Sequence, residues 1–169
     1  MTPPEFSRMV DPRQADGRRM VLEAREDERV ALARRFGLVM IDRLVADVLL
    51  ERQGEAIEAR GTLRADIVQG CAVSAEDLPI AIDEPLEFRF VPARGDHLPD
   101  EEIELDADAC DEIEYAGTSF DLGEAVAQSL ALAIDPFATG PAAEEARRAA
   151  GLGEGGAGPF AVLARLKKG

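Results

Sequence analysis

Side chains that could act as nucleophiles or proton carriers are few in this chain of 169 residues. His97 is the single histidine and lies in a loop bordered by Gly95 and Pro99, so mechanisms that require two histidines are excluded. Cys71 could act as a nucleophile only with a base beside it, and we expect a buried structural thiol. Cys110 lies among aspartates whose negative field disfavours a thiolate. Because no CxxC spacing occurs, we expect two reduced thiols rather than a disulfide framework.

Acidic side chains are abundant, with ten between Asp96 and Glu114 and no lysine or arginine among them. The alternating carboxylates from Asp106 to Asp111 could ligate a divalent cation, but the run lacks the glycine and the twelfth-position glutamate of a calcium loop. We interpret the run as a solvated charged surface and predict neither a metal site nor another cofactor. A carboxylate-based, metal-dependent hydrolase that uses the acids between Asp100 and Glu114 stays open as an alternative function.

Other catalytic patterns are missing from the sequence. Aromatic residues make up 5% of the chain and tryptophan is absent, which argues against the aromatic-rich cleft expected around sugars. The glycines near the C-terminus follow no predicted strand and lack the GK[ST] ending of a phosphate-binding loop. We therefore assign no catalytic residues and predict a protein that is not an enzyme.

The net charge of −15 disfavours a broad electrostatic grip on a phosphate backbone. The charge is unevenly placed, because residues 93–135 hold one basic and 13 acidic side chains whereas residues 136–169 hold five and three. We expect direct RNA contact only at local basic patches, which comprise Arg34, Arg35, Arg165, Lys167 and Lys168. The candidate contacts for a basic partner form the acidic segment, Asp100, Glu101, Glu102, Glu104, Asp106 and Asp108.

Length and composition predict a single globular domain, since 46% of the residues are hydrophobic and 31% are charged. The longest apolar stretch, from Leu122 to Ile134, is interrupted by polar residues and is shorter than the roughly 20 residues of a membrane span. The first eight residues lack the apolar core of a secretory signal. We expect a cytoplasmic location and no contact with a membrane.

The periodicity of apolar residues predicts an α+β fold, in which an antiparallel meander of about four to six strands packs against two main helices. The segment from Val39 to Arg52 fits both the helical period and the strand period of two, and we predict a strand there. The other expected strands lie at residues 20–24, 57–68, 80–90 and 113–115. Acids, arginines and Gly37 indicate a helix over residues 26–36, and Asp121 is placed to cap a second helix that ends before Pro136.

The C-terminal part is expected to be a flexible tail. We place the α+β domain at residues 1–138, a Gly/Ala-rich linker at 139–158 and an amphipathic peptide at 159–169. Phe160, Leu163 and Leu166 are three residues apart and would share one face of a helix, which is typical of a docking element.

Several motifs follow one another in a recognisable order. They are PEFSR at residues 4–8, RVALARRF at 29–36, ADIVQGC at 65–71, FDLGE at 120–124 followed by LALAIDP at 130–136, and PFAVLARLK at 159–167. On these motifs the chain resembles the YceD family of large ribosomal RNA subunit accumulation proteins, in its alphaproteobacterial form. Many members carry a CxxC where this chain has Cys71 followed, three residues later, by Ser74, so no zinc or redox role is carried over.

The resemblance implies a non-enzymatic role in large-subunit ribosomal RNA accumulation, and therefore in ribosome assembly. From the charge we expect the acidic segment to bind a basic ribosomal protein or assembly factor, with RNA contacted only indirectly or locally. The family's gene setting, beside ribosomal protein and lipid-synthesis genes, implies a second alternative, a regulatory adaptor that couples lipid synthesis to ribosome production.

Overall fold

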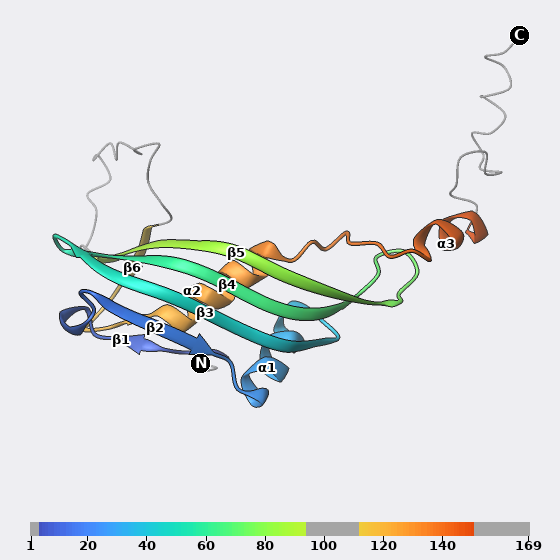
Figure 1. Ribbon diagram of the computed structural model, residues 1–169. Helices are drawn as coiled ribbons and strands as arrows, with labels where there is room; N and C mark the ends of the chain where they lie inside the picture. Colours follow the sequence, from blue (N-terminus) through green and yellow to red (C-terminus); the bar gives the residue numbers. More distant parts are fainter. Residues whose placement is uncertain (1–3, 94–111, 151–169) are drawn as a thin grey trace, which may run out of the picture.

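The computed structural model describes residues 4–93 and 112–150, which form a twisted sheet with helices packed on it (Figure 1). The main sheet has five strands in the order β2-β3-β4-β5-β6. Their bounds are β2 Arg18–Glu23, β3 Met40–Gln53, β4 Ala56–Gly70, β5 Asp77–Pro92 and β6 Glu112–Tyr115. A two-stranded sheet pairs β1, Met9–Val10, with β7, Phe120–Asp121. The predicted α+β class is confirmed.

The long central strands follow the period-two pattern of the sequence. In β4, Ile57, Leu63 and Ile67 are buried on the inner face, whereas Arg60 and Arg64 are exposed on the outer face. The turn from β3 to β4 contains Gly54, whose φ of 66° is the left-handed conformation that a tight hairpin requires. Strands β2 to β5 are consequently joined as an antiparallel meander.

The last strand of the sheet differs from a simple meander because β6 runs parallel to β5, with Phe90 opposite Ile113 and Pro92 opposite Tyr115. A period-two pattern identifies a strand but carries no information about its direction, so the sequence could not reveal this pairing. Among the described residues, β5 has no second partner between Asp77 and Phe88. Pro85 therefore lies at a sheet edge, as its missing N–H predicts.

Two helices complete the packed layer. Helix α1, Glu26–Phe36, ends at Gly37 in the left-handed conformation, and a short 3-10 turn, η1, spans Pro12–Gln14. Helix α2, Leu122–Ala133, crosses the inner face of the sheet (Figure 1). Its buried side chains join the inner residues of the strands in one hydrophobic core, in which the rings of Phe90 and Phe120 stack at 4.1 Å.

Helix α3, Ala143–Ala149, lies within the segment predicted as a linker. The residues before it contact the loop between β4 and β5, because Ala72 N donates to Ala138 O at 3.0 Å and Ala142 N donates to Glu76 Oε1 at 3.1 Å. Ala143 packs with Cys71 and Leu78 in a small apolar cluster. The boundary proposed at residue 138 stays a prediction.

Candidate interaction surfaces

The N-terminal segment is held by a buried ion pair between Arg8 and Glu28. Nη1 and Nη2 of Arg8 donate to the two carboxylate oxygens at 2.8 and 2.9 Å, and the Glu28 side chain is only 6% exposed. Oε2 of Glu28 also accepts from the backbone N of Arg25 at 2.8 Å and so satisfies an amide at the start of α1. The hydrogen bonds from Arg8, followed by the Arg25 amide, lower the pKa of Glu28 to about 2.

The same segment is fixed to α2 through Asp121. Oδ1 of Asp121 accepts from the backbone N of Arg8 at 2.8 Å and from that of Glu124 at 3.1 Å, and Oδ2 accepts from Ser7 Oγ at 2.7 Å. The predicted cap of α2 is therefore confirmed, and it serves a second purpose. The Asp121 carboxylate caps α2 and also binds the N-terminal segment. Because Arg8 of that segment also binds Glu28 of α1, the segment connects α1 to α2.

Stability should fall between about pH 5 and about pH 2 as the Glu28 carboxylate is protonated. Its pKa is depressed in the folded state relative to 4.5, so its contribution is present above the unfolded value and lost as the pH falls toward about 2. We expect a loss of about 2 kcal/mol, reduced from the full pKa shift because Arg8 is partly in contact with water. Urea unfolding at pH 7 and pH 3 measures it. Glu28→Gln should show a correspondingly smaller decline, and an equal decline in the variant would contradict the assignment.

The two arginines predicted as RNA contacts in α1 have different surroundings. Arg35 is engaged within the molecule, since it donates to Glu5 at 3.0 Å and to Glu124 at 2.8 Å, and the Glu124 hydrogen bond is the first cause of its raised pKa. Arg34 has no ion pair with a described residue and lines a groove beside α1. Their role as RNA contacts stays a prediction, and Arg34 is the more accessible of the two.

Most arginines on the outer face of the sheet lie beside acidic side chains, which reduces its basic surface, and Arg43 is the one outer-face arginine that has no ion pair with a described residue. Arg60 lies 3.1 Å from Glu58 and 3.4 Å from Glu87, and Arg64 lies 3.6 Å from Asp83. Such exposed ion pairs add little stability. They do neutralise the cations that a phosphate backbone would need.

Acidic side chains gather instead along the last two strands of the sheet. Strands β5 and β6 carry six acidic residues and one arginine, Arg89, which lies 3.5 Å from Glu58 and 3.4 Å from Glu112. We call the six the acidic edge, and all are exposed: Asp77, Asp83, Glu84, Glu87, Glu112 and Glu114. In the chain, β5 precedes the acidic segment and β6 follows it. The described fold therefore has an anionic surface of its own.

Several predicted contacts lie outside the described residues. They are the acidic segment, Asp100, Glu101, Glu102, Glu104, Asp106 and Asp108, and the C-terminal residues Phe160, Arg165, Lys167 and Lys168. Of the acids considered for a hydrolase, only Glu112 and Glu114 are described. Within residues 4–93 and 112–150 no three His, Cys, Asp or Glu side chains are grouped so that they could hold a metal ion.

Cys71 is buried, as expected, in the loop that follows β4. Its Sγ accepts from the backbone N of Ser74 and from that of Gly140, each at 3.4 Å. Ser74, whose amide donates to Sγ, is the main cause that lowers the pKa of Cys71 to about 7, and the amides of Gly140 and Val73 add to the effect. The thiolate is stabilised by donors, while the 5% exposure of Cys71 restricts access to it.

Titration of Cys71 in a Cys110→Ser chain should therefore give a midpoint near 7 when the thiolate is followed by its absorbance at 240 nm. The same chain in denaturant serves as the reference for an unperturbed thiol. A midpoint in the folded chain equal to that reference would show that these donors do not act on the sulfur.

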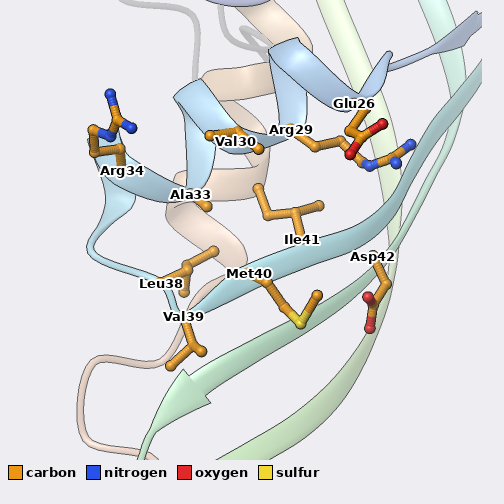
Figure 2. A pocket seen from close by; sticks show the side chains of 10 residues that line it. All are labelled: Glu26, Arg29, Val30, Ala33, Arg34, Leu38, Val39, Met40, Ile41 and Asp42. Atoms are coloured by element: carbon orange, nitrogen blue, oxygen red, sulfur yellow. The ribbon is translucent and has the colours of Figure 1, made fainter.

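A groove with a volume of about 390 Å³ lies between α1 and the start of β3 (Figure 2). Ala33 and Ile41 form buried parts of its wall, and Ile41 projects from β3 toward the helix. Three further apolar side chains in its lining are exposed: Val30 by 53%, Val39 by 52% and Met40 by 46%. Charged side chains also line it, namely Glu26, Arg29, Arg34 and Asp42. Sequence reasoning missed this groove because Val30 and Met40 look like ordinary members of periodic patterns.

Comparisons with protein-family models, with curated proteins and with solved structures give no match. No helix of the described chain is long and apolar enough to cross a lipid bilayer. The described surfaces are therefore interpreted from their own charge and shape.

Proposed function

We propose that the protein is a non-enzymatic factor for large-subunit ribosomal RNA accumulation, and that it binds a basic ribosomal protein or assembly factor through its acidic surfaces. The observation that carries the proposal is the acidic edge, which brings six exposed carboxylates onto two neighbouring strands. The paired arginines of the outer face support it, because they leave little cationic surface for RNA. The family resemblance of the motifs supplies the ribosomal context.

Binding through these carboxylates would act at long range. A cluster of like charges attracts a basic partner and accelerates its association, and salt screens the attraction. A partner held in this way is shielded from RNA until a stronger phosphate contact displaces the carboxylates. The protein would then act before the partner meets ribosomal RNA.

Pull-down of the full chain from a bacterial lysate tests the proposal, with and without nuclease. We expect a ribosomal protein or assembly factor to be retained at about 50 mM salt, to be released at about 500 mM salt, and to survive nuclease treatment. Recovery of no ribosomal component, or recovery that nuclease abolishes, would overturn the proposed direct contact with a basic protein.

A matched pair of variants locates the contact on the acidic edge. Asp77→Asn with Glu84→Gln removes two negative charges that have no ion pair with a described residue. Glu144→Gln with Glu145→Gln removes the same charge from α3. The first pair should weaken capture several-fold more than the second, and equal weakening would show that only the net charge matters.

A further inference from the structure

The groove between α1 and β3 has exposed apolar side chains among its charged ones and is open to solvent. Val30, Val39 and Met40 expose about half of their surface there, although each is a large apolar side chain. Three such residues around a single concave site form a docking surface of the helix-in-groove kind. We propose that its occupant is the chain's own C-terminal peptide, residues 159–169.

The spacing of apolar residues in the peptide suits this groove. Phe160, Leu163 and Leu166 repeat every three residues, which places them on one side of a helix of three turns or fewer. A helix that buries this stripe would cover the exposed apolar surface of Val30 and Met40. Docking would then remove apolar surface of both partners from contact with water, which is the main driving force for such binding.

The peptide and the chain as a whole carry net charges of opposite sign. The peptide contains Arg165, Lys167 and Lys168 and no acidic residue, whereas the chain as a whole has a net charge of −15. In the lining of the groove, Glu26 and Asp42 offer carboxylates to these cations, and Arg29 and Arg34 balance their charge, so the lining itself is neutral. The attraction is screened but favourable at physiological salt.

The peptide is also long enough to reach the groove. Val39 N donates to Val68 O at 2.9 Å, Val68 precedes Cys71 by three residues, and Cys71 packs against Ala143. At about 3.3 Å per strand residue this path places the start of α3 within roughly 20 Å of the groove. The helix adds about 10 Å at 1.5 Å per residue. A chain as long as residues 150–158 can reach at most about 30 Å, which is sufficient to span the sum.

The summed path is an upper bound on the span, because it adds every step along one line. At a shorter span the tether gives an effective concentration on the order of 1 mM, and a dissociation constant of about 0.1 mM then leaves about ten docked chains for each undocked one. Docking of the peptide requires no ribosomal partner. A competing partner would have to displace the peptide from the groove.

Hydrogen exchange of the full chain provides the first test. In a Phe160→Ser, Leu163→Ser, Leu166→Ser chain, amides of residues 29–41 should exchange about tenfold faster than in the unaltered chain, because the docked peptide no longer stabilises α1. Ala161→Ser is the matched control and should change nothing, because a helix that buries the stripe would leave residue 161 on its opposite side. Unchanged exchange in the triple variant would overturn the proposal.

Trypsin digestion of a chain with a substitution in the groove provides the second test. Met40→Glu should accelerate trypsin cleavage after Arg165 and Lys167 about tenfold, since the displaced peptide is more often accessible. Met9→Glu introduces the same charge at an exposed methionine outside the groove and should have no effect.

The protection should be independent of protein concentration over a hundredfold dilution. Protection that weakens on dilution would mean that a second copy supplies the peptide, and it would overturn the intramolecular assignment.

Discussion

Replacing Gly61 with alanine is expected to lower the free energy of unfolding by about 3 kcal/mol or more. Gly61 lies in β4 opposite Val48 of β3 and Leu86 of β5. A Cβ at this position would overlap the carbonyl oxygen of Asp47 and approach the Val48 Cα to 2.8 Å. Backbone atoms cannot move aside as the end of a flexible side chain can, so the two central strands would have to separate.

Chemical unfolding of the variant measures this effect, and Gly70→Ala is the matched control. Gly70 is also a residue of β4, yet a Cβ there meets no atom within 4 Å. We expect the control to change the free energy of unfolding by less than about 1 kcal/mol. Equal stabilities for the two variants would contradict the close approach of β3 and β4.

Arg8→Ala should cost about 3 kcal/mol, because it leaves the buried Glu28 carboxylate without its cation. The variant also loses the donor to the carbonyl of Glu23, at 3.1 Å. We expect the N-terminal segment to detach from α1, with faster hydrogen exchange in both. Thermal unfolding and hydrogen exchange measure the two consequences separately.

A double-mutant cycle separates the ion pair from other effects of Arg8. Glu28→Gln removes the charge but retains a carbonyl acceptor for the Arg25 amide. If the pair carries the effect, Arg8→Ala should cost much less in the Glu28→Gln background than alone. Additive losses would instead assign the effect to the packing of Arg8 on the ring of Phe6, 4.6 Å away.

The elements of the fold could largely be predicted because their signals are local. Helix α1 begins and ends at the predicted residues, since its acids, its arginines and Gly37 all mark its ends. Gly54 is an equally local signal for the hairpin between β3 and β4, because a glycine between two period-two runs can adopt the positive φ of the turn. The direction of β6 could not be predicted, because it depends on where the chain re-enters the sheet rather than on residues 112–115 themselves.

The surfaces were harder to predict than the strands. The acidic character of the middle of the chain was evident, but the pairing that adds Glu112 and Glu114 of β6 to the four acids of β5 was not. Arg8 and Glu28 are 20 residues apart and belong to different elements, so no spacing rule connects them. Gly123 carried a usable signal, since a glycine early in a predicted helix indicates close packing, here against Phe6 O and Arg8 N.

The prolines of β5 also bear on how copies of this protein behave together. Pro79 and Pro85 occupy the strand whose outer side has no described partner from Asp77 to Phe88, and neither can donate a main-chain hydrogen bond. An incoming strand would find no main-chain donor at the two prolines, and the carboxylates of the acidic edge would repel an acidic strand of a second copy. The exposed end of the sheet is therefore protected against fibril-like growth, and a Pro85→Val chain with Glu84 and Glu87 neutralised should aggregate at concentrations at which the unaltered protein stays dispersed.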